Sequence, residues 1–187
     1  MVVAGYLGTL GTVAKVLPVA EPRIIQRLLT QQAEEFFAGA QFMDAHKFAA
    51  GDSCYFLKLM AIELCFKLIY LADTESLVFG HDVREICDLL PTASRVALFD
   101  GINTFMALRL EQSAFRDWLK YIAGLFVQIR YPFEEFREMT IGEYEQRIRE
   151  FEQAPLHDLS KASIIYHHDR VDALLKAQRS YLELNGA

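Results

Sequence analysis

The stretch that decides the fold, residues 55–72, reads YFLKLMAIELCFKLIYLA. Apolar side chains lie on nearly every side of the helix that this stretch predicts, so other helices or a partner must cover it all round. Lys58, Glu63 and Lys67 interrupt the run, and each charge would cost about 2.5–3.5 kcal/mol near the centre of a bilayer. We therefore predict the central helix of a bundle and no membrane span.

The rest of the chain shows the three- and four-residue spacing of apolar side chains that is typical of amphipathic helices. Asp100 and Gly101 indicate a turn, and no alternating run of six residues indicates a strand. The fold class is therefore predicted to be all-α. The expected helices cover about residues 22–50, 53–72, 82–90, 118–130, 140–153 and 158–184.

Length, composition and charge limit the kind of protein. The 187 residues suit one domain, and 52% of them are hydrophobic, which is enough for a real core. A net charge of −6 argues against a protein coated in nucleic acid, although it allows one small basic groove. Cys54, Cys65 and Cys87 lie in apolar runs without metal-site spacing, so we expect reduced, buried thiols. Because no basic stretch typical of a secretory signal opens the chain, we expect a cytoplasmic protein.

Two charged residues share one side of the central helix. Glu63 and Lys67 are four residues apart, in the order of acid and base that attracts across one helical turn. Buried charges must be paired, so we expect an ion pair here. A structural ion pair that sets how helices or subunits pack is favoured over a functional role.

A histidine follows the central helix, in Gly80-His81-Asp82-Val83. Asp82 can cap the helix predicted at residues 82–90, because a carboxylate there accepts hydrogen bonds from the first backbone N–H groups. The His81 imidazole could act as a general acid or base near neutral pH. The alternative is a hydrogen-bonded hinge that holds the loop against the bundle.

The third feature, Arg130-Tyr131-Pro132-Phe133-Glu134, stands where a helix ends at a proline. A guanidinium at a helix end can bind a phosphate through two parallel hydrogen bonds. Alternatively, Arg130 binds carbonyl groups at its own helix end or pairs with Glu134 or Glu135. Two further basic residues lie on roughly the same side of the helix. The expected ligand-binding residues are Arg116, Lys120, Arg130, Tyr131 and Glu134.

In this order, the three features resemble the HEPN superfamily, the higher eukaryotes and prokaryotes nucleotide-binding domains. The resemblance covers about residues 53–134. It rests on Ala61-Ile62-Glu63-Leu64 in the apolar helix, on Gly80-His81-Asp82-Val83, and on the segment that begins at Arg130.

The resemblance implies a fold, an assembly and an activity. The fold would be an up-and-down helical bundle in one domain of residues 1–187, with the HEPN-like core over 22–135 and additional helices over 141–184. Such domains usually pair as homodimers, which would also cover the apolar surface of the central helix. Many are metal-independent endoribonucleases of toxin–antitoxin and antiphage systems, often encoded beside a minimal nucleotidyltransferase. An antitoxin-type protein is therefore an expected partner.

The chain departs from the family's catalytic signature, an Arg followed by four to six residues and a His. Arg130 matches the Arg, whereas Glu135, Phe136 and Arg137 stand where the His belongs. RNA cleavage needs a group that takes the proton of the 2′-hydroxyl, and these side chains do not replace imidazole. The sequence therefore favours a protein that binds RNA, a nucleotide or a protein partner near Arg130 and His81, with nuclease activity weak or lost.

Two alternatives stay open. In the first, the protein is an active metal-independent endoribonuclease in which Arg130 stabilises the phosphorane and His81 replaces the missing acid and base. In the second, it is a structural module that binds other proteins. The dipeptides His81-Asp82, His157-Asp158 and His168-Asp169, with His46, suggest a metal phosphohydrolase of the HD type. This class is disfavoured, because His167 and His168 would point about 100° apart on a helix and could not easily bind one ion. We expect no metal and no cofactor.

Overall fold

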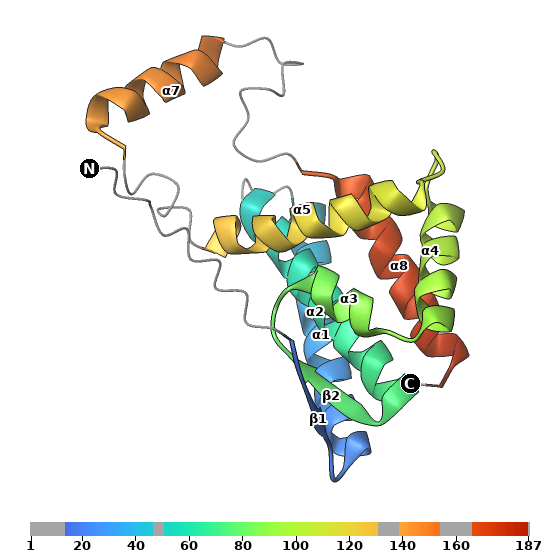
Figure 1. Ribbon diagram of the computed structural model, residues 1–187. Helices are drawn as coiled ribbons and strands as arrows, with labels where there is room; N and C mark the ends of the chain where they lie inside the picture. The colour runs from blue at the N-terminus through green and yellow to red at the C-terminus, as the bar shows by residue number, and fades with distance from the viewer. Residues whose placement is uncertain (1–13, 47–50, 131–138, 154–165, 187) are drawn as a thin grey trace, which may run out of the picture.

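The computed structural model describes residues 14–46, 51–130, 139–153 and 166–186. The fold class is all-α, as predicted, and the helices form a bundle (Figure 1). The helices are α1 (Pro22–Ala45), α2 (Gly51–Thr74), α3 (Val83–Leu89), α4 (Thr92–Phe105), α5 (Gln112–Arg130), α7 (Ile141–Gln153) and α8 (His168–Leu184).

The centre of the bundle is α2, as its sequence predicts. Tyr55, Ile62 and Phe66 are completely buried. α1, α3, α5 and α8 all pack against α2, so neighbours within the same chain cover its apolar surface. Among the helices that the structure describes, none combines the length and the apolar character that crossing a bilayer requires.

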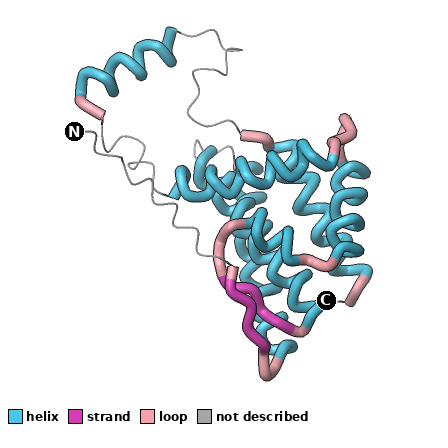
Figure 2. Tube along the Cα trace, viewed as in Figure 1, coloured by secondary structure: helices cyan, strands magenta, loops and turns pink. Residues whose placement is uncertain are grey.

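Two short strands, which no run of six alternating residues indicates, pair beside the helices (Figure 2). β1 (Lys15–Pro18) and β2 (Ser76–Phe79) are antiparallel, with Val16 opposite Val78. Four residues are too few to show an alternating pattern, and the pairing joins distant parts of the chain. Because Val78 is buried in the core, the two-stranded ladder is fixed to the bundle through β2.

The turn predicted at Asp100 and Gly101 is wrong, because α4 runs through both residues. A Cβ atom at Gly101 would lie 3.1 Å from the Cβ of Ala177 in α8. The glycine therefore allows two helices to approach closely, since a larger side chain would push them apart. Sequence alone does not separate this use of glycine from its use in turns.

Helix α8 contributes to the core, although the resemblance places this part of the chain beyond the family's core. Val171, Leu174 and Leu175 are buried, and α8 packs against α2 and α4. The buried Gln178 donates a hydrogen bond to the carbonyl oxygen of Ile62 at 3.2 Å. The helix begins at residue 168 and not near 158, and residues 154–165 lie outside the described part of the chain.

Local signals set two helix ends as predicted. Asp82 caps α3, because its Oδ1 accepts hydrogen bonds from the backbone N–H of Arg84 at 2.9 Å and of Glu85 at 3.1 Å. At the start of α7, the backbone N–H of Thr140 donates to Oε2 of Glu143 at 2.7 Å, and the N–H of Glu143 donates back to Oγ1 of Thr140 at 3.4 Å. This reciprocal pair is the expected capping box. Figure 1 shows α7 apart from the other helices.

A buried lysine joins three helices. Nζ of Lys58 on α2 lies 2.8 Å from Oδ2 of Asp44 on α1 and 3.0 Å from Oδ1 of Asp172 on α8. Asp44 also accepts a hydrogen bond from the thiol of Cys54 at 3.0 Å. In the sequence, Lys58 stands out only as a charge unsuited to a membrane. Two carboxylates from other helices allow it to be buried in the bundle.

The three cysteines are free and buried, as predicted. Burial raises the pKa of Cys65 and of Cys87 to about 12, from an ordinary value of 9.0, because apolar surroundings disfavour the thiolate. The pKa of Cys54 is raised to about 11, first by burial and then by its hydrogen bond to Asp44. All three thiols are therefore poor nucleophiles near neutral pH.

We expect the free energy of unfolding to fall as the pH rises from 9.0 to about 12. In this window the thiols ionise in the unfolded chain but stay protonated in the folded one, so alkali favours the unfolded state. Urea unfolding at neutral pH and within this window measures the fall. The fall should be smaller in the double variant Cys65→Ala, Cys87→Ala, and an equal fall in both proteins would assign it to other groups.

Candidate functional site

The structure joins two features that lie apart in the sequence. Nζ of Lys67 lies 2.6 Å from Oε1 of Glu63, and the same oxygen lies 3.0 Å from Nδ1 of His81. The Glu63 side chain is 2% exposed, and that of Lys67 is 12% exposed. The buried carboxylate of Glu63 thus lies between two groups that can carry positive charge. These groups compensate the negative charge that burial would otherwise leave unpaired.

His81 itself lies at the surface, with 65% of its side chain exposed. It follows β2 in the turn before α3, where Gly80 has a φ of 125°, a value that favours glycine. Its ring is nearly parallel to that of Phe126 on α5, with an angle of 11° and centroids 6.3 Å apart. Glu63 on α2, Phe126 on α5 and the turn at Gly80 together position the imidazole.

Glu63 orients the imidazole and leaves its other nitrogen for a ligand. An ionised carboxylate only accepts hydrogen bonds, so Nδ1 of His81 donates and carries the proton of the neutral ring. Nε2 is then an acceptor. A surface histidine held in this way can take a proton from a hydroxyl group, and the carboxylate stabilises the imidazolium that forms.

The predicted arginine stands at the end of α5, which finishes at Arg130. Position 130 comes four residues, or about one helical turn, after Phe126 on the same helix. Phe126 lies beside the His81 ring, so position 130 is about one helical turn from the residue that contacts the histidine. The side chain of Arg130, and the whole of Tyr131 and Glu134, lie outside the described residues.

The structure does not bring Arg116 and Lys120 to His81. Nη2 of Arg116 lies 2.9 Å from Oδ2 of Asp88, in a pocket formed with α3 and α4. Lys120 borders a separate, shallow hollow on α5. Position 116 precedes Phe126 by ten residues, which is about 15 Å along a helix. Arg116 and Lys120 therefore do not line one groove, although they lie on the same face of α5.

The histidines considered for a metal site lie in separate places. His81 contacts Glu63, and the ring of His168 lies beside that of Tyr55, with centroids 5.2 Å apart. His157 is outside the described residues. Within the described ranges, no group of three or more His, Cys, Asp or Glu side chains is arranged to hold a metal ion.

The contact of Glu63 with His81 is the feature that sequence reasoning missed. The two residues are 18 positions apart, on a helix and in a turn, so no local spacing connects them. One signal was present in the sequence. A buried carboxylate has room for several hydrogen bonds, and Lys67 does not fill all of them.

The fold and the site define a class of protein, an all-α bundle whose central helix holds a surface histidine through a buried carboxylate. No protein-family model, curated protein or solved structure matches the chain. A function is therefore proposed from the residues of this site.

Proposed function

We propose that this protein is a HEPN-like protein that binds RNA and cleaves it without a metal ion, with His81 as general base and acid. The observation that supports this is the exposed His81 ring whose Nδ1 is held by the buried Glu63. Lys67 already supplies the positive charge that the buried Glu63 needs. The contact between Glu63 and Nδ1 of His81 therefore acts to orient the imidazole. His81 would replace the imidazole that is absent after Arg130.

The reaction that fits this geometry is internal transfer at a phosphodiester of RNA. Nε2 of His81 takes the proton of a 2′-hydroxyl, and the hydroxyl oxygen attacks the adjacent phosphorus. The bond from phosphorus to the 5′ oxygen breaks, and the imidazolium returns its proton to that oxygen. The products are a 2′,3′-cyclic phosphate and a 5′-hydroxyl. Arg130 would offset the negative charge of the phosphorane.

The biological setting and the assembly are proposed on the resemblance alone. HEPN proteins of toxin–antitoxin and defence systems pair as homodimers, and an antitoxin-type protein would restrain the nuclease. The apolar surface of α2 gives no further support to a dimer, since helices of the same chain cover it. Light scattering at micromolar concentration would measure the mass in solution.

Removal of the imidazole tests the proposal. Labelled structured RNA is incubated with the protein in excess EDTA, and the wild type is expected to produce fragments that end in a 2′,3′-cyclic phosphate. The variants His81→Ala and Arg130→Ala should each lose about 10²–10⁴-fold in rate, the usual contribution of a positioned acid or base. His46→Ala is the matched control, because His46 stands at the end of α1 and should not affect cleavage.

The other outcomes assign the alternatives. In one outcome, the wild type binds RNA without cleaving it, and binding is lost in Arg130→Ala. This result would make the protein a HEPN-like protein that binds RNA and has lost nuclease activity. Failure to bind or cleave RNA would favour a structural module for protein partners. Cleavage that survives in His81→Ala would contradict the proposed mechanism.

A further inference from the structure

A pocket of about 740 Å³ lies between α3, α4 and α5. Cys87 and Asp88 near the end of α3 line it, together with residues of the first turns of α4 and α5. Pockets of several hundred cubic ångströms are the size that small molecules occupy. Because its wall on α5 lies well before Phe126, the pocket is separate from the surface around His81.

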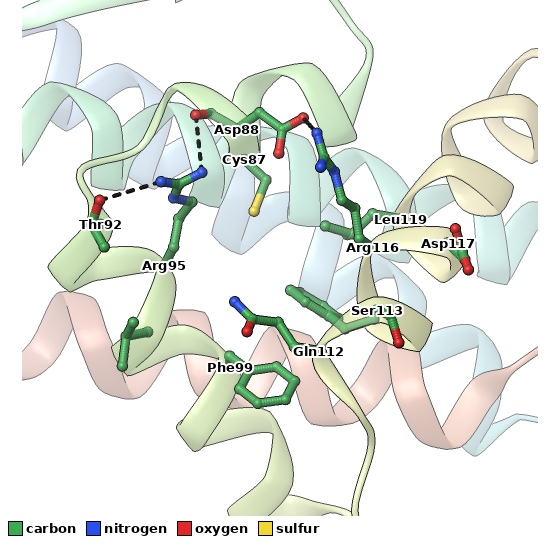
Figure 3. Close-up of a pocket in the computed structure, with 12 residues that line it drawn as sticks. Cys87, Asp88, Thr92, Arg95, Phe99, Gln112, Ser113, Arg116, Asp117 and Leu119 are labelled. Atoms are coloured by element: carbon green, nitrogen blue, oxygen red, sulfur yellow. Dashed lines mark hydrogen bonds and ion pairs between the residues drawn. The ribbon is translucent and has the colours of Figure 1, made fainter.

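Two arginines converge on one residue of this pocket (Figure 3). Nη2 of Arg116 lies 2.9 Å from Oδ2 of Asp88, and Nη1 of Arg95 lies 3.5 Å from the main-chain oxygen of the same residue. Arg95 also donates to Oγ1 of Thr92 at 3.3 Å. Within the described part of the chain, the hydrogen-bond partners of Arg95 are thus neutral oxygens, whereas Arg116 has a carboxylate.

The pocket carries an excess of positive charge near Asp88. One carboxylate faces two guanidinium groups, and each guanidinium has five N–H donors that these contacts occupy only in part. Asp117 also borders the pocket, but Figure 3 shows it beyond Arg116, on the side away from Arg95. The first turns of α4 and α5 add the partial positive charge of helix N-termini. A dianion such as a phosphate group suits this arrangement better than a carboxylate does.

The opposite wall of the pocket is apolar. Figure 3 shows Phe99 across the pocket from Asp88. Its ring packs against the buried Phe115 with centroids 5.8 Å apart, and Val96, which also lines the pocket, is 47% exposed. A flat ring placed here would cover Phe99 and Val96 and gain the contacts that aromatic pairs provide.

We propose that this pocket binds a ligand that has both a phosphate monoester and an aromatic ring, with the phosphate between Arg95 and Arg116 and the ring against Phe99. Two sources supply this chemistry, a free mononucleotide and a phosphorylated tyrosine. The site is independent of RNA cleavage at His81, because it uses none of the residues of that mechanism.

Calorimetric titration of the full chain with adenosine 5′-monophosphate and with O-phosphotyrosine tests the proposal. At least one of the two should bind. Adenosine, tyrosine and inorganic phosphate should each bind at least about tenfold more weakly, because each lacks one of the two interactions. The tighter of the two monoesters identifies the source of the ligand.

Variants then locate the bound group. Arg95→Gln and Arg116→Gln should each weaken binding by about tenfold or more, the usual effect of losing a charge-assisted hydrogen bond. Phe99→Leu should weaken binding of the monoester and leave that of inorganic phosphate unchanged. Arg149→Gln is the matched control, because Arg149 pairs with Glu145 on α7, outside the pocket. Arg95→Lys, which keeps the charge but loses the planar fork, replaces Arg95→Gln if circular dichroism shows that variant to be unfolded.

Three results would overturn the assignment. One is failure of both monoesters to bind folded wild type at millimolar concentration. Another is binding of adenosine or inorganic phosphate as tight as that of the monoesters. The third is unchanged affinity in both arginine variants. Binding should persist in His81→Ala, so a failure of the proposed RNA cleavage leaves this test intact.

Discussion

Replacement of Lys67 by methionine is expected to destabilise the fold by about 3–5 kcal/mol, the usual cost of leaving one charge of a buried pair without its partner. The Glu63 carboxylate is almost completely buried, and Lys67 is its closest cation at 2.6 Å. The exposed His81 would remain as the only other partner that the structure shows for this carboxylate. Urea unfolding of the wild type and the variant measures the difference in the free energy of unfolding.

The double variant Glu63→Met, Lys67→Met separates stability from function. Two apolar side chains of similar volume often replace a buried ion pair without loss, so the double variant should regain most of the stability that Lys67→Met loses. It should still lose cleavage of RNA to about the extent of His81→Ala, roughly 10²–10⁴-fold, because Glu63 no longer orients the imidazole. Full cleavage by the stable double variant would show that Glu63 has no part in the reaction. Stability that does not recover would show that the pair also sets the packing of α2.

Loss of both carboxylates around Lys58 should have an effect of similar size. The Lys58 side chain is 6% exposed, and its ammonium group contacts Asp44 and Asp172. The double variant Asp44→Asn, Asp172→Asn leaves this charge buried without an acid, and we expect a loss of about 3–5 kcal/mol. Each single variant should lose less, because one carboxylate remains, and the two effects should not add. Urea unfolding of the three variants measures this.

Two further variants control for other causes. Lys58→Met in the background of the double variant should restore stability, since no buried charge remains. Glu145→Gln removes the acid of an exposed pair with Arg149 on α7 and should change the free energy of unfolding by about 0.5 kcal/mol or less. Equal losses in Glu145→Gln and in the double variant would contradict a special role of Lys58.

The same cluster predicts a loss of stability in acid. The hydrogen bonds from Cys54 and from Lys58 lower the pKa of Asp44 below its ordinary value of 3.8. A carboxyl group whose pKa is lowered by folding stabilises the folded state above the ordinary value, and this stabilisation is lost as the pH falls below it. The stability of the wild type should therefore fall below pH 3.8 toward that of Asp44→Asn.

Much of the helical framework could be predicted from sequence because its signals are local. The apolar run of α2, the carboxylate of Asp82 and the pair Thr140 and Glu143 all act within one or two turns of the chain. The apolar pattern depends on helix period, and the caps depend on backbone N–H groups of the next few residues. These local signals therefore predict the same helix and the same helix ends in almost any tertiary structure.

The chemistry of the site depended on contacts that sequence spacing does not encode. His81 meets Glu63 across 18 residues, and Arg95 on α4 and Arg116 on α5 meet at Asp88 on α3. The spacing of Arg116 and Lys120 on one helix suggested a groove with Arg130, but α3 and α4 place Arg116 in another pocket.

By itself, the sequence determined that this protein is an all-α bundle with α2 at its centre, because helix period and apolar composition act along the chain. Only the tertiary structure decided which charges are buried together, where β1 pairs with β2, and that Gly101 allows α4 and α8 to pack closely. The physical reason is that these contacts form between segments far apart in sequence, and packing of the whole core fixes their distances.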